Sequence, residues 1–486
     1  MRYIIGIVNH ECEERSDGMS VVEEKRFQVH ENLNVVPIVL VLISGGFVTI
    51  LNQTLLVTAL PSIMHDLHLT SVMVQWLQTV FLLVNGIMIP ITAFLEGRFT
   101  TRSLFLFAMG SFTFGTLVCL VSNDFIFLIV GRIIQAIGAG IMMPLMMAVM
   151  FIIFPIEKRG SVMGIFGLVI GFAPAIGPTL SGWLITHYSW RILFYVVLPV
   201  ALIDFILAYF ILKNVTKLTY PKLDVLSILL STLGFGGLLY GSSIAGSRGW
   251  GDSEVLITLV AGAAALTVFI LRQFRLEQPI LEFRVFRYPI FTLTTTIGML
   301  SFSVFIAGAT MLPIYMQTML GFSPLKSGLM LLPGAIIMGA MSPITGRIFD
   351  KIGARGLSIT GISILLAMTL LMSRLSANTS FTYLAIINAV RMMGLSMVLM
   401  PTTTAGLNQL PRHLIPHGTA MNNTMRQVAG SIGTALLFTV MASSALNPQK
   451  YGVGGLIHGV DTAFFVASFL CLIALILTFF VKKPST

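Results

Sequence analysis

Long apolar segments constrain this chain more than any other feature of its sequence. A helix that crosses a bilayer needs about 20 mostly apolar residues, and segments of that length recur from residue 35 to residue 481. Each run is continuously apolar rather than alternating, which favours helices over a barrel. We therefore predict an all-α polytopic membrane protein with fourteen spanning helices. The predicted ranges are 35–57, 73–94, 103–122, 124–148, 160–184, 190–212, 224–245, 254–273, 290–312, 326–347, 356–374, 380–403, 420–443 and 461–481.

The composition agrees with lipid as the main solvent of the chain. Charged residues make up 10% of the 486 residues, whereas a water-soluble domain carries roughly 25%. The three cysteines form no CxxC pair, which argues against a disulfide or metal framework. We find no cleavable signal peptide, nucleotide-binding glycine-rich loop or nucleophile–base pair. The sequence therefore predicts no enzyme, no catalytic residue, no metal and no cofactor.

The basic residues indicate how the helices are oriented. Cytoplasmic loops of membrane proteins are enriched in Lys and Arg, and this bias is satisfied when both termini lie in the cytoplasm. Few of the 29 Lys and Arg residues then fall in outside loops: Arg191, Arg248, Lys326, Arg374 and Lys450. The net charge of +10 is thus explained by topology, and a nucleic-acid partner is excluded.

Residues 1–34 are polar and form a predicted cytoplasmic tail. Met19 begins a plausible start, and the preceding Glu14-Arg15-Ser16 can be encoded by a purine-rich ribosome-binding sequence. We therefore hypothesise that residues 1–18 are an over-extended gene prediction. Mass spectrometry that finds Met1 on the purified protein would refute this hypothesis.

An internal repeat divides the helices into two related halves. Leu60–Met64 is followed by the string Pro90–Arg102, and the similar Leu312–Met316 is followed by the similar string Pro343–Arg355. The repeat predicts a six-helix bundle at 35–212, a two-helix insert with its linker at 213–289, a second bundle at 290–481 and a tail at 482–486. Paired repeats are typical of transporters, which rock two halves around a midplane site.

The loop after the predicted helix 326–347 contains Gly346, Asp350, Lys351, Gly353 and Arg355. This spacing resembles the Gly-x-x-x-Asp-Arg/Lys-x-Gly-x-Arg signature of the major facilitator superfamily. The resemblance implies a latch that stabilises one conformation, while Asp350 by itself is able to cap a helix.

The first copy of this signature is degraded. Arg98 and Arg102 remain, and Glu96 is a candidate for a displaced carboxylate. Three signature positions differ: Ala93, Gly97 and Thr100. An ordinary latch in the first half is therefore in doubt.

Two further motifs narrow the resemblance to the fourteen-helix drug:proton antiporters of the EmrB/QacA type. Arg132 and Gln135 match an Arg-x-x-Gln element, for which the resemblance implies a role in proton transfer. A charge inside a span is costly and functional by default, although Arg132 could instead tie helices together. A Gly/Pro-rich helix is similar to the motif that marks antiporters, or reflects generic tight packing. Its residues are Gly171, Pro174, Gly177, Pro178 and Gly182.

Carboxylates inside the membrane are the candidates for proton binding. The family often carries an Asp in the first helix, but this chain has Asn52, which cannot titrate. Asp204 is the only acid deep in a predicted span, and burial there favours its protonated form. Its alternative role is a structural one. Asp224 opens the predicted helix 224–245, where either a coupling role or a helix cap is sufficient to explain it.

The resemblance places substrate in a cavity between the halves. We expect this cavity to include Asn52, Gln53, Gln135, Gln317 and Arg391. The predicted function is proton-coupled export of amphipathic drugs or antibiotics across the cell membrane by a monomer. The alternatives are a narrow exporter of one antibiotic or endogenous metabolite, and a transport-inactive regulatory protein. The lincomycin-resistance, LmrB-like branch is a candidate relative.

Overall fold

The computed structural model describes residues 35–215 and 218–481. The hypothesised start at Met19 and both predicted tails lie outside these residues. Within them the chain is helical, with no strand in the described ranges.

Fourteen long helices follow one another in the described chain. Their bounds are α2 Val35–Asp66, α3 Ser71–Arg98, α4 Thr101–Val121, α5 Phe125–Ile153, α6 Arg159–His187, α7 Ile192–Ile211, α8 Val225–Arg248, α9 Ser253–Arg275, α10 Pro289–Ile314, α11 Pro324–Ile352, α12 Ala354–Leu371, α13 Phe381–Leu407, α14 Ile415–Ser443 and α15 Pro448–Thr478. Four short segments join them: η1 Ile156–Lys158, η2 Phe283–Arg287, the π-helical η3 Tyr315–Met319 and η4 Arg412–Leu414.

The predicted number and order of helices are confirmed. By length and hydropathy, 13 of the described helices are able to span a membrane. The remaining long helix, α14, has 29 residues but is less apolar because it carries a polar cluster. This cluster comprises Asn422, Asn423, Thr424, Arg426 and Gln427.

Two predicted helix bounds differ clearly from the structure. The first helix continues past residue 57 to Asp66. The last helix begins at Pro448 rather than at residue 461, with a kink at Gly452, where φ is 58°. Hydropathy locates the apolar part of a helix, whereas its hydrogen-bonded backbone extends into the polar loops. Positive φ is readily adopted by glycine, which explains the kink site.

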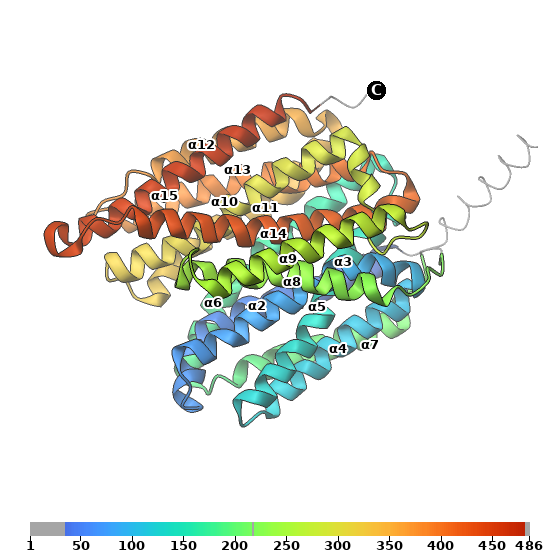
Figure 1. Cartoon of the computed structure of the whole chain (residues 1–486), viewed down its shortest axis with the longest axis horizontal. Helices are drawn as coiled ribbons and strands as arrows, with labels where there is room; N and C mark the ends of the chain where they lie inside the picture. The colour runs from blue at the N-terminus through green and yellow to red at the C-terminus, as the bar shows by residue number, and fades with distance from the viewer. Residues whose placement is uncertain (1–34, 216–217, 482–486) are drawn as a thin grey trace, which may run out of the picture.

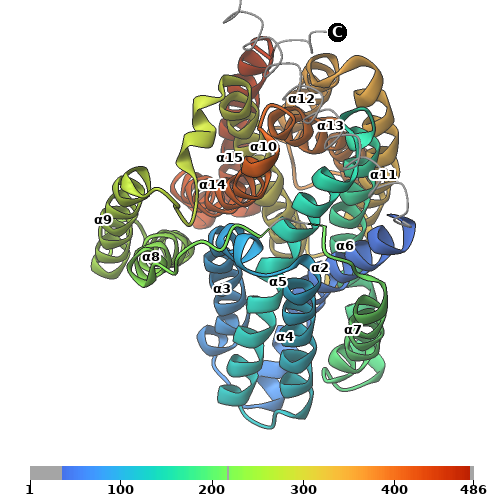
Figure 2. The same cartoon turned by 90° about the vertical axis from the view of Figure 1, so that its right-hand side faces the viewer.

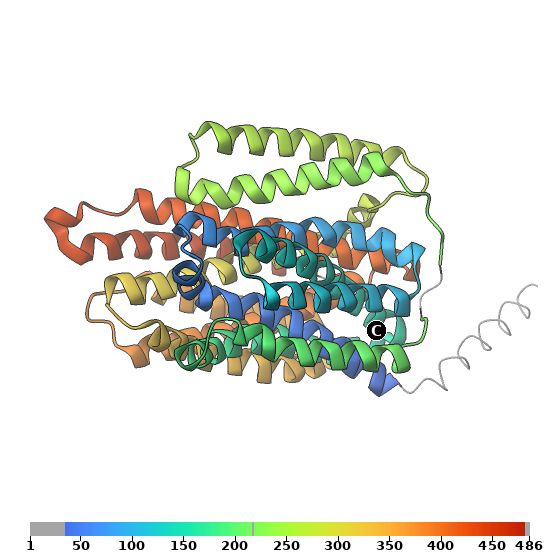
Figure 3. The same cartoon turned by 90° about the horizontal axis from the view of Figure 1, so that it is seen from below.

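The helices form two bundles and an external hairpin. Most of the helices α2–α7 pack with one another, as do most of α10–α15, while α6 and α11 pack most extensively on each other and join the two bundles. Figure 2 shows the two bundles one above the other. The hairpin α8–α9 lies outside both bundles, as Figure 3 shows most clearly. The described chain ends near Val35 and Val481 lie at the same end of the bundle, on the right in Figure 1. We call it the basic end, because most Lys and Arg residues are predicted there.

The hairpin α8–α9 is attached to both bundles through α8, which packs against α3 and α14. Trp76 of α3 stacks on Tyr240 of α8, with ring centroids 5.7 Å apart. Trp250 of the hairpin turn donates a 2.5 Å hydrogen bond from Nε1 to Thr439 Oγ1 of α14. The outer helix α9 packs almost exclusively on α8, so most of its apolar surface is left for lipid.

Candidate functional site

The closest approach between the two halves is made by α6 and α11. A Cβ atom built on Gly171 of α6 would lie 2.9 Å from the backbone nitrogen of Gly339 in α11. A Cβ built on Gly164 would lie 2.8 Å from Pro343 Cα, and one built on Gly167 would lie 2.9 Å from Ser342 Cβ. Small residues allow backbones to come this close inside a membrane. The two helices therefore form a backbone-to-backbone interface between the halves.

Asp350 closes this interface at the basic end. Its carboxylate accepts hydrogen bonds from the backbone nitrogens of Gly160 and Ser161, both at 2.8 Å, and from Ser161 Oγ at 2.5 Å. Gly160 and Ser161 lie in the first turn of α6, whose N-cap residue Lys158 provides no side-chain cap. A carboxylate there satisfies free N–H groups and is attracted by the helix dipole. Asp350 of the second half thus caps a helix of the first half.

Two neighbouring contacts strengthen the closure. Arg159 Nη1 donates a 2.9 Å hydrogen bond to Asn408 Oδ1 at the end of α13. Arg159 is itself held by the carbonyl oxygens of Phe151 and Phe154. Deeper in the bundle, Asn423 of α14 lies 3.2 Å from the sulfur of Met147 in α5. The halves are consequently joined by polar contacts at the basic end.

The opposite ends of α6 and α11 are exposed. A Cβ built on Gly182 would meet no atom within 4 Å, and the neighbouring Trp183 is 58% exposed. On α11, Leu325 is 56% exposed and Leu329 is 42% exposed. The interface is therefore tight along its basic-end portion and unpacked at the other end.

The antiporter-like motif of α6 divides between two neighbours. Gly171 faces α11, whereas Gly177 faces Thr54 of α2 within the first half. Pro174 is half-buried, and Pro178 also lies within α6. The remaining member, Gly182, lies at the exposed end described above. The motif thus provides close approach on two sides of one helix.

Arg132 and Gln135 act as a buried pair within the first half. Arg132 Nη1 donates to Gln135 Oε1 at 2.9 Å, and Nε donates to the Leu77 carbonyl at 3.2 Å. The guanidinium lies 4.1 Å from the centre of the Phe81 ring, and Gln135 Nε2 donates to Thr116 Oγ1 at 2.8 Å. Because the Gln135 amide is occupied in this way, the geometry favours a role in joining α3, α4 and α5 over direct contact with substrate.

Arg391 is the counterpart of Arg132 in the second half. It is fully buried and donates from Nη2 to the Val304 carbonyl of α10 at 2.6 Å. Its Nε and Nη1 have no hydrogen-bond partner among the described residues. The guanidinium lies against Gly308 of α10, so it is enclosed in the second bundle rather than facing the first.

Arg426 lies within the predicted span 420–443, but the sequence alone does not assign it to the site. In the structure it is buried on α14 and donates to the Leu399 carbonyl at 2.8 Å and to Thr403 Oγ1 of α13. Its depth inside a predicted span was the available signal. The structure adds that it faces α13 within its own half.

Asp204 is enclosed in the first bundle. It is 2% exposed, and its Oδ1 accepts a hydrogen bond from Ser44 Oγ of α2. Its Oδ2 is buried without a partner among the described residues. The carboxyl lies beside Gly45, and the side chains of Met109 and Phe105 of α4 reach the same glycine. Asp204 therefore has a hydroxyl donor and apolar neighbours, and it lies behind α2 rather than at the interface with the second half.

The other predicted cavity residues are dispersed. Asn52 is 3% exposed and its Nδ2 has no partner in the described ranges, while Gln53 next to it is half-buried. Gln317 is exposed in the π-helical segment η3 beyond α10. The structure thus does not bring Gln317 together with Asn52 or Gln135.

Asp224 forms a clip at the base of the α8–α9 hairpin. It caps α8 through Ser227, and its oxygens accept from Arg272 Nε at 2.9 Å and Nη2 at 3.1 Å. The hydrogen bonds from Arg272 hold the pKa of Asp224 below its usual value. A carboxylate kept ionised in this way is a poor proton carrier, so the geometry favours the capping role.

The first-half copy of the latch differs from the second. Arg102 donates from Nη2 to the Tyr209 carbonyl at 2.6 Å and lies over the Tyr209 ring, so it joins α4 to α7 within one half. Arg98 is exposed. The Gly97 carbonyl accepts hydrogen bonds from the backbone nitrogens of Thr219 and Tyr220, at 3.0 and 3.2 Å. The linker to α8 therefore packs on the degraded first-half signature, where the sequence leaves a latch in doubt.

In the second-half loop, Gly346 lies against Gly160 and Gly164, and Gly353 ends α11 with φ of 75°. Lys351 is exposed and Arg355 is half-buried. The two glycines are therefore explained by close approach and by backbone conformation, respectively.

Comparisons with known proteins place this arrangement in a family. Residues 42–434 match the model of the Major Facilitator Superfamily. An uncharacterized MFS-type transporter of Bacillus subtilis, YcnB, is 54% identical over 92% of this chain and 95% of its own length. The lincomycin resistance protein LmrB of Bacillus subtilis is 40% identical over 95% of this chain and 99% of its own. Both the family and the LmrB-like branch expected from the sequence are confirmed.

A solved structure shows the same fold at low sequence identity. The human organic anion transporter MFSD10 superposes with a TM-score of 0.63 at 15% identity, covering 91% of this chain and 99% of that one. The relatives are transporters rather than enzymes. The chain is a multi-pass membrane protein that belongs to the major facilitator superfamily of transporters.

Proposed function

We propose that the protein is a proton-coupled exporter that moves amphipathic drugs or antibiotics across the cytoplasmic membrane by alternating access. The observation that carries this proposal is the asymmetric closure between the halves. Asp350 caps α6 across the interface at the basic end, while the other ends of α6 and α11 are exposed. With both termini in the cytoplasm, this geometry corresponds to a conformation closed to the cytoplasm and open outward.

Asp204 is the proposed proton carrier. A carboxylate with one hydroxyl donor and apolar neighbours is costly to keep charged inside a membrane, which favours proton binding. Because Asp204 lies behind α2, its effect on substrate is indirect. Ionisation of Asp204 changes its contact with Ser44 of α2, and α2 in turn contacts the Gly177 region of α6 through Thr54.

The substrate class is supported by the resistance protein LmrB, which covers nearly all of this chain. The proposed path lies between the halves, where α3, α5 and α6 meet α11, α13 and α14. Methionines such as Met147 and Met400 lie along it, and their flexible thioethers adapt to varied apolar ligands.

The test uses inverted membrane vesicles that are loaded with a pH-sensitive dye. Lincomycin and chemically unrelated amphipathic drugs are added separately, and we expect drug-dependent proton release. Asp204→Asn should abolish this release at unchanged protein level. The control is Asp252, which caps α9 by accepting from the backbone nitrogens of Glu254 and Val255; Asp252→Asn should retain the release. Normal coupling in Asp204→Asn would remove Asp204 as the carrier.

The pattern of responses separates the alternatives. A response to one compound would support the narrow exporter. An inserted, folded protein that releases no protons with any compound would support the regulatory alternative.

A further inference from the structure

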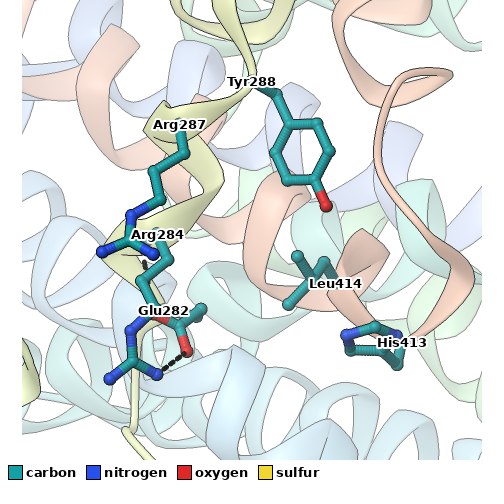
Figure 4. A pocket seen from close by; sticks show the side chains of 6 residues that line it. All are labelled: Glu282, Arg284, Arg287, Tyr288, His413 and Leu414. Atoms are coloured by element: carbon teal, nitrogen blue, oxygen red, sulfur yellow. Dashed lines mark hydrogen bonds and ion pairs between the residues drawn. The ribbon is translucent and has the colours of Figure 1, made fainter.

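A pocket at the basic end lies outside the path between the halves. It has a volume of about 360 Å³ and lies between η2 and η4. Its lining residues are Glu282, Arg284, Arg287, Tyr288, His413 and Leu414. Figure 4 shows Arg284 and Arg287 on one wall of the pocket and Leu414 and His413 on the other. The Tyr288 hydroxyl points towards Leu414.

The segment η2 is fixed in place by its apolar side. Phe283 and Val285 are buried, and the Phe283 ring contacts Phe269 and Phe274 of α9 at centroid distances of 5.9 and 6.1 Å. The polar side chains of η2 consequently project from a rigid base. The pocket wall is therefore preformed.

The only carboxylate of the lining is already occupied. Glu282 Oε1 accepts from the Arg284 backbone nitrogen at 3.0 Å, and Oε2 accepts from Arg284 Nη1 at 3.2 Å. Arg284 also donates to the Phe274 carbonyl at 3.1 Å. The charges of Glu282 and Arg284 thus offset each other.

Three groups in the pocket remain available to a ligand. The Arg287 guanidinium, the Tyr288 hydroxyl and the His413 ring form no hydrogen bond or ion pair with any described residue. A cation, a hydroxyl donor and an imidazole together match an anion that has several acceptor oxygens. Arg412, adjacent to His413, lies near enough to Arg159 of α6 for the two positive charges to repel each other, so Arg412 adds to the positive potential at this end.

The surroundings of the pocket favour a lipid over a free anion. Leu271 and Phe274 on the outer face of α9 are 57% and 44% exposed, and Phe274 contacts the Phe283 ring beside the pocket. An acyl chain is able to lie along this apolar surface while its head group enters the pocket. Basic pockets between helices at the cytoplasmic membrane surface bind anionic head groups in this manner.

We propose that this pocket binds the phosphate of an anionic lipid head group, with Arg287 as its principal contact and Tyr288 and His413 as the opposite wall. The bound lipid bridges η2, which leads into α10, and η4, which leads into α14. It therefore holds the linker from the α8–α9 hairpin against the second bundle. This site is independent of the proposed transport activity.

Native mass spectrometry of the full-length protein in detergent tests the proposal. Phosphatidylglycerol, phosphatidylcholine and inorganic phosphate are titrated separately. We expect a retained phosphatidylglycerol whose affinity falls roughly five- to tenfold in Arg287→Gln, as for one basic side chain near an anionic lipid surface. A second variant, His413→Gln, should also weaken retention. Lys222→Gln, which removes an exposed charge from the same end of the bundle, should leave the affinity unchanged.

Each outcome is decisive. Equal phosphatidylglycerol affinity in the wild type and Arg287→Gln would overturn the assignment, as would equal retention of phosphatidylcholine. Complete displacement of the lipid by millimolar inorganic phosphate would overturn the lipid source in favour of free phosphate. Retention that persists in phosphate and depends on Arg287 would support the proposal.

Discussion

Asp350→Ala should release the closure between the two halves at the basic end. The substitution removes the acceptor of the hydrogen bonds from Gly160 N, Ser161 N and Ser161 Oγ. A hydrogen bond to a charged group contributes about 1.5–3 kcal/mol. Because one carboxylate is shared and the freed N–H groups regain water, we expect a net loss of roughly 2–4 kcal/mol. Since about 1.4 kcal/mol is a tenfold change in an equilibrium, the opened population should rise at least about 30-fold.

A thiol probe at the interface measures this population. Ser342 is 1% exposed and faces Gly167 of α6, so Ser342→Cys is protected while the halves are closed. Cys119 and Cys471 are buried, and Cys12 is replaced by Ser. A membrane-impermeant thiol reagent is applied to inverted vesicles. Its reaction rate should rise at least about 30-fold in Asp350→Ala and less in Asp350→Asn, because Asn still caps helices.

The control is another capping aspartate, Asp124, whose capping hydrogen bond lies within the first half. Asp124 accepts from the Phe127 backbone nitrogen at 2.9 Å at the start of α5. Asp124→Ala should therefore cost local helix stability without exposing residue 342. An unchanged labelling rate in Asp350→Ala, or an equal increase in Asp124→Ala, would refute the reasoning.

The hairpin clip and the glycine interface give two further predictions. Arg272→Gln should lower the thermal stability of the detergent-solubilised protein at neutral pH. Arg272 holds the pKa of Asp224 below its usual value. The difference in thermal stability between the wild type and Arg272→Gln should therefore be fully present above the unfolded-state pKa of Asp224, ~4. This difference should vanish as the pH falls through the depressed pKa of Asp224 in the folded protein. A difference that grows on acidification would contradict this linkage. Gly171→Leu should prevent the approach of α6 to α11 and abolish drug-dependent proton release. Gly182→Leu should be tolerated, because a Cβ at position 182 has no neighbour within 4 Å. Equal activity of both variants would show that the close approach is dispensable.

Hydropathy and charge bias are sufficient to predict the helices because the bilayer imposes one strong rule. Every lipid-facing backbone group must be satisfied within its own segment, so an apolar run of adequate length becomes a helix. The same rule explains the least accurate bounds. Beyond the apolar part of α2, residues up to Asp66 continue the helix, and hydropathy carries no information about this polar extension. Likewise, α14 falls short of the spanning criterion because it carries polar residues such as Asn422 and Arg426, which are buried in the structure.

The site was less predictable because its residues depend on contacts between distant segments. The signature loop identified Asp350, but its partners Gly160 and Ser161 carry no signal of their own in the sequence. Depth in a span identified Asp204 and Arg132 equally well. Only the structure shows that Arg132 is paired with Gln135, whereas Asp204 has one hydroxyl donor and an unpartnered oxygen.

The two halves differ in the way their capping positions are used. In the second half Asp350 reaches across to the first turn of α6, but the corresponding first-half position is Gly97, which has no side chain. The related helix α14 accordingly begins at Ile415, and its N-cap residue Leu414 provides no side-chain cap. A Cβ on Gly97 would lie 2.8 Å from Thr219 Oγ1, so the missing side chain is what allows the linker to α8 to dock there. The linker to α8 thus occupies the space that a side chain at position 97 would need. Closure at the basic end then depends on Asp350, which makes the conformational equilibrium more sensitive to this residue than to Arg98 or Arg102.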